Sequence, residues 1–139
     1  MRIGVPKEIK PQENRIGLTP DSVKTLVSEG HEVLVENNGG FEACFDNDQY
    51  KNAGAKIIEK STDIFDDAEI IVKVKEPQKV EVEMIKENQI VYTYLHLAAA
   101  KELTEGLVKS KSINIAYETI TDDNGRLPVS YTHLRSHDT

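Results

Sequence analysis

The sequence predicts an α/β fold in which helices cover both faces of one parallel β-sheet. Short apolar runs rich in isoleucine and valine recur along the chain, as in buried strands. Amphipathic segments of about ten to fifteen residues separate these runs, which favours right-handed βαβ units. At 139 residues the chain has the length of a single domain, large enough to bury about two thirds of its unfolded surface. We therefore expect a doubly wound sheet of the Rossmann-like or flavodoxin-like kind.

The first strand and the first helix have clear boundary signals. Arg2–Val5 is a short apolar run that a proline stops, so it is predicted as a strand. Thr19 is placed to accept a hydrogen bond as an N-cap, and Pro20 suits the first helical position. Gly30 can end this helix in the left-handed conformation. A second strand is expected over residues 31–36.

The middle of the chain alternates between short helices and strands. Asp46 is expected to cap a short helix, and a brief strand follows at Lys56–Ile58. Ser61 or Thr62 is expected to cap another helix. The run EIIVKV over residues 69–74 then predicts a buried strand.

The last part of the chain continues the same alternation. A weak amphipathic helix is expected around Met84 and Ile85, and the apolar run over residues 90–100 predicts the next buried strand. A final strand is expected over residues 112–117. The helix between these two strands is marked by one apolar face, formed by Leu103, Leu107 and Val108.

The charge balance and the cysteine count exclude several classes of protein. With 17 basic and 24 acidic residues the net charge is −7, which argues against binding to nucleic acid or to an anionic membrane surface. No apolar stretch approaches the roughly 20 residues of a membrane-spanning helix. The single cysteine, Cys44, cannot form an internal disulfide, and the chain opens directly into a strand without a signal-type leader. A cytoplasmic protein is therefore expected.

Three residues that can carry chemistry follow predicted strands. Arg15 lies in the loop after the first strand, Lys75 closes the run over residues 69–74, and His96 lies just past the strand that begins at residue 90. Ligands bind outside the carboxyl ends of parallel strands, so these side chains are expected to share one crevice. An arginine fork matches a carboxylate, a lysine ammonium can bind a second oxygen, and an imidazole can move protons near neutral pH. This set suits a small oxo acid or amino acid.

Each of these residues also has a purely structural interpretation. A lysine or arginine in a loop is usually a solvated charge, and a histidine beyond a strand is often a structural residue. Glu118, at the end of the last predicted strand, could orient one of the cations or face water. Position alone leaves both interpretations open.

Two common signatures of a bound group are absent or incomplete. The glycines form neither the G-x-G-x-x-G loop nor the P-loop pattern, so no cofactor-binding residue is predicted in this chain. His133 and His137 have the i, i+4 spacing of metal ligands on a helix, but no further ligand beyond Asp138 accompanies them, so no metal site is predicted. Residues 129–139 show neither helical nor strand periodicity and are expected to be disordered.

Four segments resemble the alanine dehydrogenase family, which shares its opening signature with the nicotinamide nucleotide transhydrogenase alpha subunit. They are MRIGVPKEIKPQENRIGLTPDSVKTLVSEGHEVLVE at the start, DDAEIIVKVKEPQ around Lys75, IVYTYLHLAAAKELTEGL around His96, and INIAYETI, which contains Glu118. The resemblance covers residues 1–128. The segment around His96 favours the alanine dehydrogenases, because transhydrogenases resemble the opening but lack this histidine run.

The resemblance implies a role for each candidate residue. Arg15 would bind the substrate carboxylate, Lys75 would hold that carboxylate or polarise the carbonyl, and His96 would be the catalytic acid and base. The reaction would be the NAD-dependent oxidative deamination of L-alanine to pyruvate and ammonia. Members of this family are homo-oligomers with two domains, and NAD is bound mainly by the second domain.

The resemblance also implies how this chain is divided. Residues 1–128 would form the N-terminal substrate domain, and residues 129–139 would be unrelated to the family, either non-native or disordered. The cofactor domain would be absent, so the chain alone is expected to be inactive because it has nowhere to hold NAD. The alternatives are a fragment of a transhydrogenase alpha subunit and a non-enzymatic α/β module that binds a small anion.

Overall fold

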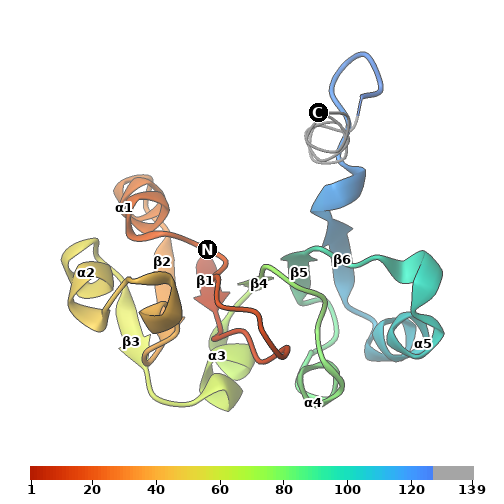
Figure 1. Cartoon of the computed structure of the whole chain (residues 1–139), viewed down its shortest axis with the longest axis horizontal. Helices are drawn as coiled ribbons and strands as arrows, with labels where there is room; N and C mark the ends of the chain where they lie inside the picture. The colour runs from red at the N-terminus through yellow and green to blue at the C-terminus, as the bar shows by residue number, and fades with distance from the viewer. Residues whose placement is uncertain (127–139) are drawn as a thin grey trace.

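The computed structural model describes residues 1–126, and its centre is a six-stranded sheet in which every neighbouring pair of strands is parallel. The strands are β1 (Arg2–Val5), β2 (Glu32–Glu36), β3 (Lys56–Ile58), β4 (Ile70–Val72), β5 (Ile90–Thr93) and β6 (Ile113–Ala116). Their order across the sheet is β3-β2-β1-β4-β5-β6 (Figure 1). This order is typical of Rossmann-type sheets and confirms the predicted doubly wound α/β fold.

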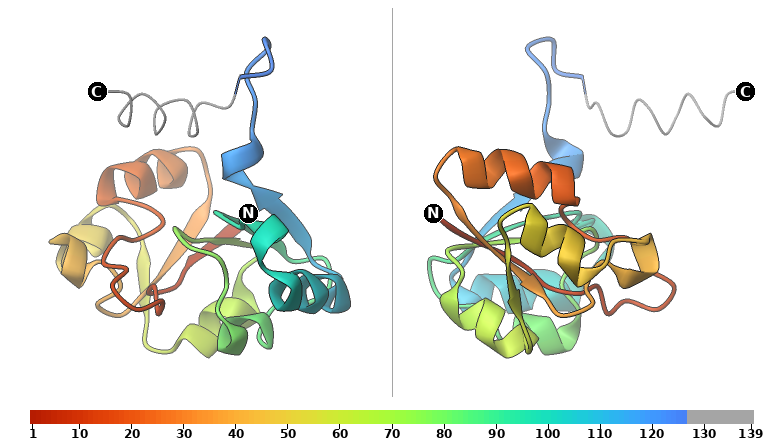
Figure 2. Two further views of the ribbon diagram at one scale, coloured as in Figure 1. Left: turned by 45° about the vertical axis from the view of Figure 1, so that its right-hand side comes forward. Right: turned by 90° about the vertical axis from the view of Figure 1, so that its left-hand side faces the viewer.

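Helices cover both faces of this sheet. Those in the described part of the chain are α1 (Pro20–Ser28), α2 (Asn47–Asn52), α3 (Ser61–Asp67), α4 (Lys79–Val82) and α5 (Lys101–Ser110). Figures 1 and 2 show α1 and α2 on one face and α3, α4 and α5 on the other. Among residues 1–126, no helix has both the length and the apolar character needed to cross a membrane.

The apolar core is divided between the two faces because side chains alternate along each strand. On one face, Val23 of α1 packs in a cluster with Val5 of β1. On the other face, Phe65 of α3 packs in a second cluster with Ile71 of β4 and Val91 of β5. All five side chains are buried, so each helix layer is held to the sheet by its own core.

The predicted helix boundaries are confirmed where a side chain caps the helix. The Thr19 hydroxyl oxygen accepts the Ser22 N–H at 3.2 Å before α1, and Gly30 follows that helix with a φ of 94°. The Asp46 carboxylate accepts the Gln49 N–H at 2.9 Å and caps α2. Helix α5 and the strands β1, β2, β3 and β6 also lie where the sequence places them, some with slightly shorter ends.

The start of α3 differs from the prediction. A cap at Ser61 or Thr62 is wrong, because the helix begins at Ser61 and the preceding residue, Lys60, makes no side-chain cap. The carbonyl of Lys60 accepts the Asp63 N–H at 3.2 Å, so backbone bonds alone start the first turn. The burial of Phe65 stabilises the helix in place of a cap.

The strand predicted over residues 69–74 is shorter than expected. It ends as β4 at Val72. The Lys73 N–H still donates to the Tyr92 carbonyl at 3.0 Å. The amides of Val74 and Lys75, however, donate to the carboxylate of Glu8 at 3.0 and 3.1 Å instead of continuing the ladder. A side chain from another loop has therefore replaced a neighbouring strand as their partner.

In the segment between α3 and α5, two further element boundaries differ from the prediction. The helix expected around Met84 and Ile85 lies earlier in the chain, at α4, where the Glu81 carboxylate accepts the Gln78 N–H at 2.9 Å and starts the helix. The apolar run over residues 90–100 is a strand only as far as the end of β5. It stops there because the following amides bind a carboxylate outside the sheet.

Candidate functional site

The carboxyl ends of β1, β4 and β5 meet at one edge of the sheet, where the strand order reverses between β1 and β4. In open α/β sheets this reversal is the point at which ligands bind. Arg15 comes from the loop between β1 and α1, Lys75 from the segment after β4, and His96 from the segment after β5. The structure therefore places the three predicted residues at this edge, where the Arg15 side chain is 67% exposed and His96 is also exposed.

An aromatic ring connects two of these residues. The Lys75 Nζ lies 5.1 Å from the centroid of the Tyr94 ring, within the range of a cation–π contact. The rings of Tyr94 and His96 are stacked, with centroids 5.7 Å apart and planes at 10°. An ammonium and an imidazole thus contact the same ring. Sequence reasoning misses Tyr94, although its position one strand alternation before His96 is the signal that could find it.

The backbone of His96 has an uncommon conformation. Its φ of 49° and ψ of 46° lie in the left-handed region, which residues other than glycine rarely adopt. The Glu118 carboxylate accepts the N–H of His96 at 2.7 Å and that of Leu95 at 3.0 Å. The partners of Glu118 are thus these backbone amides, whereas the sequence suggested a cation or water. Glu118 orients the segment that carries His96.

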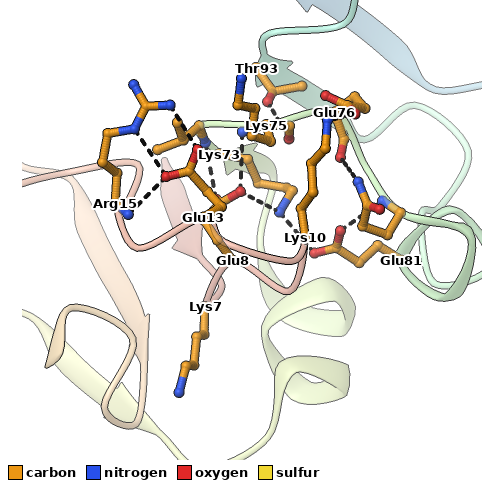
Figure 3. Close-up of polar contacts among 12 residues, drawn as sticks. Lys7, Glu8, Lys10, Glu13, Arg15, Lys73, Lys75, Glu76, Glu81 and Thr93 are labelled. Atoms are coloured by element: carbon orange, nitrogen blue, oxygen red, sulfur yellow. Dashed lines mark hydrogen bonds and ion pairs between the residues drawn. The ribbon is translucent and has the colours of Figure 1, made fainter. Parts of the chain in front are cut away.

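Arg15 is paired with a neighbouring carboxylate (Figure 3). Its Nε and Nη2 donate to the two oxygens of Glu13 at 3.0 and 2.7 Å, and its backbone N–H donates to the same carboxylate at 2.9 Å. The hydrogen bond from the guanidinium holds the pKa of Glu13 at about 2 and raises the pKa of Arg15. A guanidinium has about five N–H donors, so Arg15 keeps donors for a ligand.

The Glu13 carboxyl should titrate with a midpoint at about 2 in the unmodified protein, and Arg15→Ala should raise this midpoint toward the ordinary value of 4.5. Because the pKa of the folded state is depressed, the pair stabilises the fold above about pH 4.5, and this contribution is lost as the pH falls toward 2. Carbon-13 NMR of the side-chain carboxyl measures the midpoint. Arg2→Ala is the control, because the Arg2 guanidinium donates to the Asp67 carbonyl instead. A midpoint near 4.5 in the unmodified protein would exclude the pair in solution.

A buried ion cluster, formed by Glu8, Lys73 and Glu81, lies beside the site (Figure 3). The Lys73 Nζ is 3.1 Å from a Glu8 oxygen and 2.9 Å from a Glu81 oxygen, and each of the three side chains is at most 3% exposed. Burial raises the pKa of Glu81. Sequence reasoning misses this cluster. The feature of the sequence that indicates the cluster is Lys73 inside the apolar run EIIVKV, because a charged side chain is rarely buried without a partner.

A groove of about 820 Å³ lies elsewhere, between α4 and α5. Its walls include Pro77, Val82 and Leu103, and none of the three predicted site residues lines it. The candidate residues therefore occupy an open edge of the sheet and not this groove.

Among residues 1–126, the loop between β1 and α1 is not the glycine-rich loop that holds a dinucleotide phosphate. The loop between β1 and α1 contains Gly17, where a Cβ would lie 2.6 Å from the Val72 carbonyl oxygen. This glycine thus allows the loop to pack on β4, and it does not open the loop to a phosphate. Residues 1–126 contain no group of three or more His, Cys, Asp or Glu side chains that could bind a metal ion. The pair His133 and His137, with the rest of segment 129–139, lies outside the described residues.

Comparison with known proteins identifies the family of the chain. The family model described as alanine dehydrogenase/PNT, N-terminal domain, matches residues 4–133. The chain belongs to this family. The alanine dehydrogenase of Staphylococcus epidermidis is 49% identical over 129 residues, and that of Methanococcus maripaludis is 46% identical over 129 residues. These matches cover 93% of this chain but 34% and 35% of the relatives, so the chain spans about a third of their length.

Solved structures of the family have the same fold. A structure of an L-alanine dehydrogenase superposes with a TM-score of 0.90 at 48% identity, covering 93% of this chain and 36% of that one. A transhydrogenase from Sinorhizobium meliloti superposes with a TM-score of 0.81 at 25% identity, covering 86% of this chain and 36% of that one. The family resemblance predicted from the sequence is confirmed, and the alanine dehydrogenase is the more similar of these two structures.

Proposed function

We propose that this chain is the substrate-binding part of an NAD-dependent L-alanine dehydrogenase, an oxidoreductase that converts L-alanine to pyruvate and ammonia. One observation carries the proposal: an ammonium and an imidazole contact the Tyr94 ring at the edge where α/β sheets bind ligands. Membership of the family and the 48% identity to a solved L-alanine dehydrogenase support it.

Each candidate side chain has a role that its chemistry permits. Arg15 pairs its remaining guanidinium donors with the substrate carboxylate. Lys75 binds that carboxylate or polarises the carbonyl oxygen, and its charge stabilises negative oxygen in the transition state. His96 protonates the oxygen that leaves as water when pyruvate and ammonia combine, and it removes a proton in the reverse direction.

NAD, the hydride acceptor in alanine oxidation, is assigned mainly to another part of the enzyme. The loop after β1 packs against the backbone of β4 through Gly17, and the sequence has no G-x-G-x-x-G run. The role proposed for this chain is therefore to bind and orient the substrate and to move protons.

Pyruvate should bind to the 139-residue chain, and Arg15→Ala or Lys75→Ala should each weaken binding about tenfold to a hundredfold. Each substitution removes a charge-assisted hydrogen bond, which contributes on the order of 1.5 to 3 kcal/mol. The chemical shifts of Tyr94 and His96 in an NMR titration measure the binding. The control is Lys56→Ala, because Lys56 pairs with Glu32 on the opposite half of the sheet. An unchanged titration in both site variants would reject these roles.

A transhydrogenase alpha subunit is the second candidate, because a solved transhydrogenase shares this fold with a TM-score of 0.81. A complete protein of that kind would exchange hydride between nicotinamide nucleotides and would not deaminate alanine. Alanine-dependent reduction of NAD by the complete gene product separates the two enzymes. A non-enzymatic anion-binding module would bind pyruvate and show neither activity.

A cytoplasmic location and a homo-oligomeric complete enzyme belong to the same proposal. The single cysteine, Cys44, is consistent with a reducing compartment. The net charge of −7 supports a small-molecule substrate over a nucleic-acid or membrane partner.

A further inference from the structure

The backbone that carries Lys75 lies outside the ladder of the sheet. Strand β4 ends at Val72, and the last ladder bond of this segment runs from the Lys73 N–H to the Tyr92 carbonyl at 3.0 Å. Backbone N–H and carbonyl groups away from water need hydrogen-bond partners. The partners of Val74 and Lys75 therefore decide where this segment lies.

Side chains from three other parts of the sheet supply these partners, and Figure 3 shows two of them, Glu8 and Thr93. The Glu8 carboxylate, in the loop after β1, accepts the N–H groups of Val74 and Lys75 at 3.0 and 3.1 Å. The Thr93 hydroxyl, at the end of β5, donates to the Lys75 carbonyl at 2.8 Å. The Tyr117 hydroxyl, just after β6, donates to the Val74 carbonyl at 2.6 Å. Burial raises the pKa of this phenol, so it is a protonated donor at neutral pH.

Glu8 is the member of this set whose chemistry is hardest to replace. Its two oxygens face three N–H donors, because the Lys73 ammonium approaches at 3.1 Å in addition to the two amides. An ionised carboxylate only accepts hydrogen bonds, whereas a glutamine amide has one accepting oxygen and an NH2 group that would face another donor. Burying a carboxylate is costly without such partners, and the Glu8 side chain is 1% exposed.

We propose that Glu8 is a positioning residue for Lys75. By accepting the Lys75 N–H, it fixes the main chain from which the Lys75 side chain extends over the Tyr94 ring. Glu8 itself does not contact the substrate. The inference rests on the proposed function, because the position of Lys75 affects ligand binding only if Lys75 is a substrate ligand.

The experiment compares Glu8→Gln with Glu81→Gln in the full 139-residue chain. Both substitutions replace a buried carboxylate that binds Lys73, but only Glu8 binds the Lys75 amide. Glu8→Gln should weaken pyruvate binding about tenfold, the effect of one lost charge contact. Glu81→Gln should leave the affinity for pyruvate unchanged.

An NMR signal reports the position of Lys75 without any ligand. The ring current of Tyr94 should shift the signals of the protons on the Lys75 ε-carbon upfield, because the ammonium lies over that ring. Glu8→Gln should return these signals toward ordinary lysine values, and Glu81→Gln should not. Equal shifts and equal losses of affinity in the two variants would overturn the proposal, since they would report a general effect of buried charge.

Two further variants separate the remaining outcomes. If Glu8→Gln does not fold, Glu8→Asp keeps a negative charge for Lys73 but shortens the side chain by one methylene, so its carboxylate moves away from the Lys75 amide and the Lys75 signals should also move. Unchanged Lys75 signals in Glu8→Asp would then overturn the proposal. Lys75→Ala tests the proposed function on its own. If Lys75→Ala leaves pyruvate binding intact, the proposed function fails. The change in the Lys75 signals between the unmodified protein and the Glu8 variant then still decides whether Glu8 positions Lys75.

Discussion

Replacing Lys73 with methionine should lower the free energy of unfolding by about 3 to 5 kcal/mol, the usual cost of removing one partner from a buried ion pair. The Lys73 ammonium lies between the carboxylates of Glu8 and Glu81, at 3.1 and 2.9 Å. Without it, two like charges would remain buried with no cation between them. A native domain is stable by about 5 to 15 kcal/mol, so the variant should lose a large share of its stability. Urea unfolding followed by circular dichroism measures the loss.

Lys56→Met is the matched control for this substitution. It removes the lysine of an exposed pair, in which the Lys56 Nζ lies 2.8 Å from a Glu32 oxygen and the Lys56 side chain is 68% exposed. Water already solvates both of these charges, so the urea midpoint should hardly move. An equally small change in Lys73→Met would contradict a buried ion cluster in solution.

Replacing Phe65 with alanine should cost about 3 to 5 kcal/mol, because it leaves a cavity the size of a phenyl ring. Phe65 is fully buried in α3 and packs in the same cluster as Ile71 of β4 and Val91 of β5. Helix α3 also connects the edge strand β3 to the central strand β4, so its contact with the sheet joins the two halves of the fold. Thermal and urea unfolding should both report the loss.

Phe41→Ala is the corresponding control, because the Phe41 side chain is 64% exposed. Its removal should change the free energy of unfolding by no more than about 0.5 kcal/mol. If Phe65→Ala were equally mild, α3 would not be packed on the sheet in solution.

The parts of the fold that could be predicted depend on neighbours in the sequence. A cap such as Thr19 or Asp46 binds an amide only a few positions away, and a left-handed residue such as Gly30 acts at its own position. The alternation of apolar runs and amphipathic segments then predicted a parallel sheet with a layer of helices on each face. The carboxyl ends of parallel strands share one edge of the sheet. The sequence alone was therefore enough to place Arg15 and His96 at the same edge.

The parts that could not be predicted depend on contacts between distant positions. Glu8 and Lys73 are 65 positions apart, so the apolar run around Lys73 indicates that its charge needs a partner but does not identify Glu8 as that partner. Their contact also explains why β4 is shorter than its apolar run, since the Glu8 carboxylate takes the amides that would have extended the ladder. The role of Glu8 was therefore visible only once β1 and β4 were known to be neighbours.

The central position of β1 has a consequence for the time course of folding. The ribosome makes β1 well before β4, yet β4 is one of the two neighbours of β1, and Ile3 pairs with Ile70. At about 5 to 20 residues per second, roughly 3 to 13 s pass before β4 is synthesised. Non-local parallel pairing is also slow compared with helix formation. The Glu8 carboxylate and the Lys75 N–H that it accepts come from the segments after β1 and β4, so this contact forms only after that late pairing.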